Sequence, residues 1–148
     1  MGPPGRAPQR HGRMHNRPMD HPFGDLLGLR FTSAPSGSSR CTLSLAPEHL
    51  NPHGVAHGAV VFALADTGMG AALYPTLAAG ETCATIEIKI SYFRPVSRGE
   101  LVCESTLVNR GRSVAHLDSR VFAGDTLIAA ASGNFAILAP REPARDRA

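Results

Sequence analysis

A single long apolar segment, Asn51 to Leu73 (NPHGVAHGAVVFALADTGMGAAL), dictates most of the architecture open to this chain. It opens as a polar loop that contains Pro52 and Gly54, and from Gly58 onward apolar residues follow one another without a polar face. A helix that is apolar on nearly every side must be covered on nearly every side. The segment therefore predicts one central helix, with its first turn at Gly58, that the rest of the chain wraps.

The segments around this helix have the period-two pattern of strands. Before the helix we expect a short helix within 21–30 that leads into a strand near 28–33, and then a half-buried strand within 38–46. After it, TCATIEIKISYF places its isoleucines and Tyr92 on one side and Thr85, Glu87 and Lys89 on the other. Three further strands are expected over 99–109, 113–123 and 126–138, so that the last four strands form a meander. One helix against one antiparallel sheet is an α+β fold, here with a curved sheet of five to six strands.

Length and charge limit the organisation of the chain. With 148 residues, 43% of them hydrophobic, one compact domain over about 21–140 is expected. Residues 1–20 and 141–148 are rich in Pro, Gly, Arg and His or in charge, and we expect disordered tails there. The formal net charge is only +3, and many of the cations lie in these tails, so no basic groove for nucleic acid is expected.

The cysteines and the termini indicate a cytoplasmic protein. Cys41, Cys83 and Cys103 are odd in number and fall in expected strands, as free thiols of a reducing compartment do. The N-terminus has no apolar core of a secretory signal. The run Gly58–Ala79 is long enough to span a membrane, but Asp66, three glycines and a proline interrupt it, so we expect no membrane partner.

Three histidines before the helix are a candidate metal site. His49, His53 and His57 recur every four residues, which would align them on a helix. Pro52 and Gly54 lie between them and break any helix, so loop histidines and no metal are expected. The sequence also has no phosphate-binding loop and no G-x-S-x-G motif, which argues against nucleotide-loop and serine-hydrolase chemistry.

Asp66 is the only formally charged residue between His49 and Gly80. Burying an unpaired carboxylate costs several kcal/mol, so it must be paired, exposed or used. Gly58 opens the helix, where backbone N–H groups lack intrahelical partners and can bind an oxygen with partial negative charge. Taken singly, Asp66 could instead be a partly exposed carboxylate bonded to an amide or to Thr67, and Gly58 an ordinary helix start.

Helix geometry separates these two residues. Eight residues correspond to about 12 Å along the axis, so one small reacting centre cannot touch both Gly58 and Asp66 of one helix. If the two cooperate, a second copy of the helix must run antiparallel beside the first. Ala63, Gly68 and Gly70 would permit that approach, and a two-fold dimer would then hold two identical sites.

The pattern N-P-x-G-x-x-H-G-x-x-x-x-x-L-A-D-x-x-x-G-A at 51–71, followed by I-S-Y-F-R-P-V and by Gly99-Glu100, resembles the hotdog-fold acyl-CoA thioesterases of the PaaI (phenylacetic acid degradation) type. The similarity covers nearly all of 22–139. It implies a hotdog fold and hydrolysis of an aryl or short- to medium-chain acyl-CoA to a carboxylate and free coenzyme A. It also implies a homodimer, or a homotetramer of two dimers, with no cofactor beyond the coenzyme A of the substrate.

The same resemblance implies roles for individual residues. Asp66 matches the catalytic carboxylate, which acts as general base on a water or as nucleophile. Gly58 matches the oxyanion donor, His57 and Asn51 line the site from the other subunit, and Thr85 helps to place the water.

Two further segments match contacts to coenzyme A in the family, and arginine forks suit its phosphates. Alternatively, the arginines of these segments are ordinary solvent-exposed residues at strand ends. One departure is Ala59, where many relatives have a second glycine, and its methyl should narrow the approach to the next N–H. A binding protein that does not hydrolyse acyl-CoA, and a hydratase or dehydratase on the same fold, remain alternatives. The implied contact residues are Tyr92, Arg94, Pro95, Arg110, Gly111, Arg112 and Ser113.

Overall fold

The computed structural model describes residues 20–140, so the tails expected over 1–20 and 141–148 lie outside the described residues except for Asp20. Within these residues, two α-helices, two short 3-10 turns and six strands follow one another. In order they are α1 (Pro22–Leu27), β1 (Arg30–Ala34), β2 (Ser38–Ser44), η1 (Pro47–His49), α2 (Gly58–Leu73), η2 (Tyr74–Thr76), β3 (Thr82–Tyr92), β4 (Glu100–Arg110), β5 (Val114–Ala123) and β6 (Thr126–Leu138).

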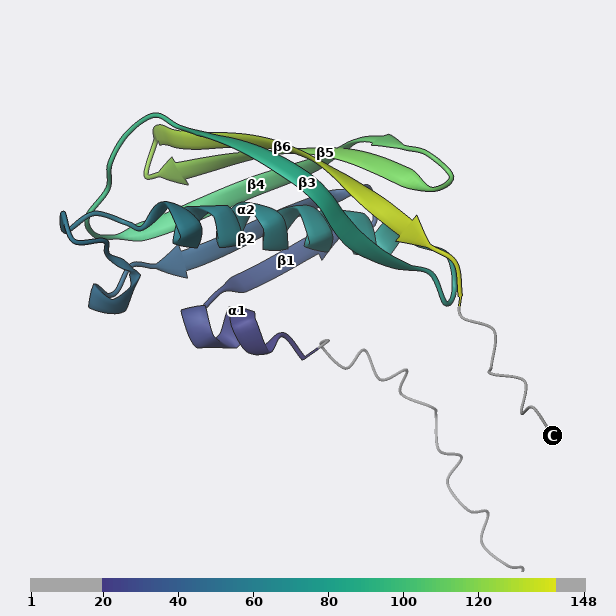
Figure 1. Ribbon diagram of the computed structural model, residues 1–148, viewed down its shortest axis with the longest axis horizontal. Coiled ribbons are helices and arrows are strands. Elements are labelled where there is room, and N and C mark those ends of the chain that lie inside the picture. The colour runs from purple at the N-terminus through teal and green to yellow at the C-terminus, as the bar shows by residue number, and fades with distance from the viewer. Residues whose placement is uncertain (1–19, 141–148) are drawn as a thin grey trace, which may run out of the picture.

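The six strands form one antiparallel sheet in the order β1-β2-β4-β5-β6-β3. Figure 1 shows α2 lying along the hollow side of this sheet, between β1 and β2 on one side and β3, β6 and β5 on the other. The expected α+β architecture, one long helix wrapped by a curved sheet, is confirmed. No helix within 20–140 is long and apolar enough to cross a membrane.

The predicted four-strand meander is wrong at its first step. Only β4, β5 and β6 are consecutive neighbours, whereas β3 pairs with β6 at the far edge of the sheet. The loop between β3 and β4, which includes Pro95, has seven residues and is longer than a typical hairpin loop of two to five residues. The chain uses this length to cross from one side of the sheet to the other.

The predicted phase of β3 is also wrong, because the strand contains a bulge. Its pairing with β6 runs from Thr85↔Phe135 directly to Glu87↔Asn134, which leaves Ile86 as the extra residue, 55% exposed. Ile88 and Ile90 pack against the core after the bulge, and Cys83 does so before it. A bulge reverses the alternation of faces, so Thr85 shares the helix-facing side with Ile88 and not with Lys89.

The local sequence sets both ends of α2. His57, in an extended conformation, caps the first turn, and Pro75 follows the last residue by two positions within η2. Most of the helix lies against the core, as its apolar composition predicts. The buried residues are Val60, Val61, Ala63, Leu64, Ala65, Gly68, Met69, Ala71, Ala72 and Leu73.

Gly68 lets α2 approach its own sheet and not a second helix, which corrects the role we expected for it. A Cβ at this position would lie 2.6 Å from Ser105 Oγ and 3.3 Å from Cys103 Sγ. Ser105 is fully buried, and its hydroxyl lies 2.6 Å from that of Ser119. The Gly68 carbonyl also accepts a hydrogen bond from Ser39 Oγ at 2.5 Å.

Substituting Gly68 by alanine should therefore destabilise the protein by about 1 to 3 kcal/mol, the usual cost of overpacking a core. Urea unfolding followed by circular dichroism measures this change. The matched control is Gly70→Ala in the same helix, where an added Cβ meets nothing within 4 Å. That control should gain up to about 1 kcal/mol from helix propensity, and equal losses for both variants would contradict the packing explanation.

Candidate active site

The loop before α2 is held by hydrogen bonds to histidine and asparagine side chains. The His57 N–H donates to the His49 carbonyl at 2.8 Å, and the buried His49 ring accepts from the Ala46 N–H through Nδ1 at 2.9 Å. Asn51 Oδ1 accepts from the His53 N–H at 2.9 Å. Asn51 therefore orders the loop through its carbonyl oxygen, and any contact with a ligand must come from its amide nitrogen.

The first two backbone N–H groups of α2 differ in whether they have a hydrogen-bond acceptor. His57 Nδ1 accepts from the Ala59 N–H at 3.0 Å, so the donor next to the Ala59 methyl is already occupied. The Gly58 N–H has no acceptor among residues 20–140. At the positive end of the helix dipole, one backbone donor is thus free for a ligand oxygen.

Tyr92 locks the position of Gly58. Its hydroxyl donates to the Gly58 carbonyl at 2.7 Å, and a Cβ on Gly58 would lie 3.2 Å from both Cζ and Oη of the ring. Partial burial raises the pKa of the Tyr92 hydroxyl, which keeps it protonated and able to donate. The absence of a side chain at position 58 is therefore what allows the ring to reach the helix start.

A cavity of about 320 Å³ opens beside Gly58. Its walls come from the loop before α2, the first turn of α2 and the segment after β3. Three predicted coenzyme A contacts, Tyr92, Arg94 and Pro95, line it together with mostly apolar side chains. The remaining lining residues are Val55, Ala56, Val61, Phe93, Val96 and Ile128.

Asp66 lies on α2, partly exposed, and is not left unpaired. Thr85 Oγ1 donates to Asp66 Oδ1 at 2.8 Å across from β3. The bulge at Ile86 makes this contact possible, because it turns Thr85 toward the helix. The alternative expectation, a bond to Thr67, is not what the structure contains.

Cys83 lies on the same strand two residues before Thr85. Burial, and secondly the charge of Asp66, raise the pKa of its thiol. Burial likewise raises the pKa of Cys41 to about 12 and also raises that of Cys103. Cys41, Cys83 and Cys103 are all free, so they are neutral thiols near pH 7.

Within one chain, the two predicted coenzyme A segments lie at opposite ends of β3. Tyr92 is the last residue of β3, and Arg94 and Pro95 follow it, whereas Arg110 contacts Glu81, which immediately precedes the first residue of the strand. The eleven residues of β3 separate the two ends by about 33 Å. One coenzyme A bound to a single chain cannot use both segments.

The structure therefore places the candidate site residues in two groups, which we call half-sites. One contains Gly58 with His57, Asn51 and Tyr92, and the other contains Asp66 with Thr85. Sequence reasoning missed the Tyr92 bond to Gly58, the proximity of Cys83 to Asp66 and the pairing of Glu81 with Arg110. Only the last had a sequence signal, an acidic and a basic residue at strand ends, and that signal is too common to interpret alone.

Comparison with known proteins decides the family. The family model of the thioesterase superfamily matches residues 53–130, a segment that contains every residue of both half-sites except Asn51. The chain belongs to the thioesterase superfamily. It is a hydrolase that acts on thioesters, and its resemblance to PaaI-type hotdog proteins is confirmed.

Individual relatives of this thioesterase span most of its length. A curated protein of Archaeoglobus fulgidus named "Putative esterase" is 32% identical over 74% of this chain and 70% of its own. A conserved protein from Pseudomonas aeruginosa of known structure is 33% identical, with a TM-score of 0.78 over 81% of this chain and 96% of its own. A mutant of the phenylacetic acid degradation protein PaaI from Thermus thermophilus is 28% identical, with a TM-score of 0.72 over 78% and 98%.

Proposed function

We propose that this thioesterase hydrolyses acyl-CoA to a carboxylate and free coenzyme A, at sites that two chains form together. One observation carries the proposal. An apolar helix holds a carboxylate, Asp66, that is fixed by Thr85, and the same helix begins with the N–H of Gly58, which has no acceptor among residues 20–140. A base or nucleophile and an oxyanion donor are what ester hydrolysis requires.

The spacing of these groups supports a dimer with antiparallel helices. Gly58 and Asp66 of one chain lie about 12 Å apart along α2, so a single reacting carbon needs one group from each chain. β3 offers the place for pairing, because it is an edge strand of eleven residues, and its outer side pairs with no other strand in the described part of the chain. Edge strands of this length are normally covered, and Ile86 and Tyr92 on it are 55% and 52% exposed.

Antiparallel pairing of two β3 strands would also unite the coenzyme A segments. The end of β3 in one chain would lie beside the start of β3 in the other. Tyr92, Arg94 and Pro95 of one chain would then face the turn 110–113 of its partner, which contains Arg110, Gly111, Arg112 and Ser113. Two such dimers could associate further into a tetramer without altering either site.

In the proposed reaction the thioester carbonyl oxygen accepts a hydrogen bond from the Gly58 N–H. This bond stabilises the negative charge of the tetrahedral intermediate. Asp66 of the partner takes a proton from a water that Thr85 helps to place, and the water oxygen bonds to the carbonyl carbon. The carbon–sulfur bond then breaks, and the coenzyme A thiolate leaves with the proton from Asp66. Direct attack by Asp66, with a later hydrolysis of the anhydride, uses the same geometry.

The same residues support a proposal for the size of the acyl group, for the cofactors and for the cellular location. The mostly apolar cavity beside Gly58, about 320 Å³ in volume, suits an aryl or a short- to medium-chain group, with Arg94 on its wall for a phosphate. The reaction as written needs no metal and no redox cofactor. Three free thiols are in keeping with a cytoplasmic location.

A thiol-release screen tests the proposal. Acetyl-, hexanoyl-, palmitoyl- and phenylacetyl-CoA are each incubated with the purified protein, and free coenzyme A is trapped with a chromogenic disulfide. The raised pKa values of Cys41, Cys83 and Cys103 keep the background reaction of the protein small. We expect turnover with hexanoyl- or phenylacetyl-CoA well above that with palmitoyl-CoA.

The alternatives give different results in the same samples. A binding protein would raise the melting temperature with acyl-CoA but release no thiol. A hydratase or dehydratase would change the absorbance of an enoyl-CoA without releasing thiol. Either result would overturn the proposed function.

A further inference from the structure

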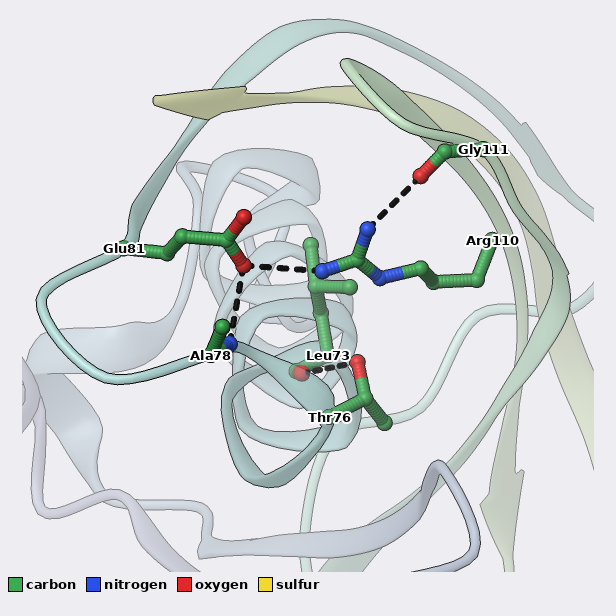
Figure 2. A network of polar contacts seen from close by, with 6 residues as sticks. All are labelled: Leu73, Thr76, Ala78, Glu81, Arg110 and Gly111. Atoms are coloured by element: carbon green, nitrogen blue, oxygen red, sulfur yellow. Dashed lines mark hydrogen bonds and ion pairs between the residues drawn. The ribbon is translucent and has the colours of Figure 1, made fainter. Parts of the chain in front are cut away.

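Arg110 and Arg112 lie on either side of Gly111 in the β4–β5 turn, yet they have different surroundings. Figure 2 shows the Arg110 guanidinium directed at Glu81, beside the last turn of α2 at Leu73. Arg110 Nη2 lies 2.8 Å from Glu81 Oε2, and Nη1 donates to the Gly111 carbonyl at 2.8 Å. The two charged side chains are only 27% and 21% exposed.

Glu81 in turn is fixed to the backbone after α2. Its Oε2 also accepts from the Ala78 N–H at 2.8 Å, as Figure 2 shows. Arg110, Glu81 and Ala78 therefore join the β4–β5 turn to the segment that links α2 to β3. Hydrogen bonds between ionised groups are stronger than neutral ones, and they are stronger still when water is partly excluded.

The turn has two further restraints. The Gly111 N–H donates to the Val114 carbonyl at 2.8 Å, and a Cβ at position 111 would lie 2.7 Å from that same oxygen. The Ile137 N–H of β6 donates to the Ser113 carbonyl at 2.9 Å. The backbone on both sides of Arg112 is thus held in one conformation.

Arg112 itself is exposed and makes no hydrogen bond or ion pair within residues 20–140. Its guanidinium is free to bind an anion in a bidentate manner. Arg110 is less available, because each of its terminal nitrogens already donates one hydrogen bond and the Glu81 carboxylate would repel an incoming phosphate. The two arginines differ in availability, although the sequence presents them alike.

We propose that Arg112 alone supplies the phosphate contact of this turn, and that Glu81 and Arg110 are positioning residues that hold the turn so that Arg112 meets coenzyme A. This inference rests on the proposed function and refines it. It adds Glu81, a residue outside the family pattern, to those that determine affinity for the substrate. It also predicts that a residue of negative charge assists the binding of a negatively charged ligand.

The test compares Arg112→Ala, Arg110→Ala, Glu81→Ala and the Arg110→Ala/Glu81→Ala double variant on two substrates. One is the preferred acyl-CoA, and the other is the same acyl group on pantetheine, which lacks the phosphates and the nucleotide. Arg112→Ala should raise KM about tenfold for the acyl-CoA only, with kcat and the melting temperature unchanged. Arg110→Ala and Glu81→Ala should each lower the melting temperature and raise KM for the acyl-CoA several-fold, and the double variant should be no worse than either.

The direction in which Glu81→Ala changes KM for the acyl-CoA decides whether Arg110 positions the turn or binds a phosphate itself. If Arg110 bound a phosphate directly, removal of Glu81 would free its cation and remove a repulsive charge, so KM would fall. A lower or unchanged KM in Glu81→Ala, or an Arg110→Ala variant with raised KM and an unchanged melting temperature, overturns the inference. Glu81→Gln, which keeps the acceptor for the Ala78 N–H, serves if the alanine variant does not fold. Failure of the proposed function is distinct, since the wild type would then release no thiol, while the non-additive melting temperatures would persist.

Discussion

Replacing Asp66 by asparagine should lower kcat for acyl-CoA hydrolysis by about 10² to 10⁴-fold, the usual contribution of a general base. Asparagine keeps an oxygen that can accept the hydrogen bond from Thr85, now 2.8 Å from Asp66 Oδ1, so the fold should not change. Turnover is measured by thiol release at saturating substrate. Circular dichroism and size-exclusion chromatography establish that fold and assembly are retained.

The matched control is Asp118→Asn. Asp118 is also a carboxylate bonded by a hydroxyl, since Ser132 Oγ donates to its Oδ1 at 2.7 Å, but it lies on the outer face of the sheet. Its removal should leave kcat within about twofold of the wild type, as for surface substitutions remote from a site. Wild-type turnover by Asp66→Asn would rule out the carboxylate mechanism.

Replacing Gly58 by proline should lower kcat by about 10² to 10³-fold relative to Gly58→Ala, the effect of losing one oxyanion donor. Proline removes the N–H, while the first helical position and the extended His57 before it (φ −62°, ψ 133°) both accept it. Alanine retains the N–H and adds a Cβ at the same place, 3.2 Å from the Tyr92 ring.

The pair of variants separates chemistry from packing. Any disturbance of Tyr92 by the new Cβ is common to both, so the two variants differ in the N–H, which the proline ring replaces. The kcat ratio of the two, taken from thiol release with equal melting temperatures as the check on folding, reports the effect of that replacement. Equal kcat values for Gly58→Pro and Gly58→Ala would show that this N–H does not stabilise the oxyanion.

The sequence was sufficient for the elements that depend on local pattern. The all-round apolar composition of 58–73 predicted the helix and its start at Gly58, and a turn at 110–112 was expected between the strand patterns of 99–109 and 113–123, within one residue of the turn that the structure has. The two half-sites also follow from the helix, because eight residues fix the spacing of Gly58 and Asp66. These features need no knowledge of distant contacts.

The features that failed depend on long-range pairing. The position of β3 beside β6 is set by the whole sheet, and the period-two pattern of 82–92 carries no mark of the bulge at Ile86. That bulge is what turns Thr85 toward Asp66, so a correct strand prediction still put this residue on the wrong face. In the same way, Arg110 and Arg112 look equivalent until the fold places Glu81 beside one of them.

Complementation between two inactive variants tests the central claim, that each active site takes Gly58 from one chain and Asp66 from the other. Asp66→Asn and Gly58→Pro are co-expressed with different tags, and the doubly tagged and mixed populations are assayed for thiol release. In a mixed dimer one site combines both defects and the other has none. Random mixing should thus restore about one quarter of the wild-type activity, since half of the dimers are mixed and each has one intact site. Activity no greater than the mean of the two parent proteins would contradict a shared site and place Gly58 and Asp66 in separate functions.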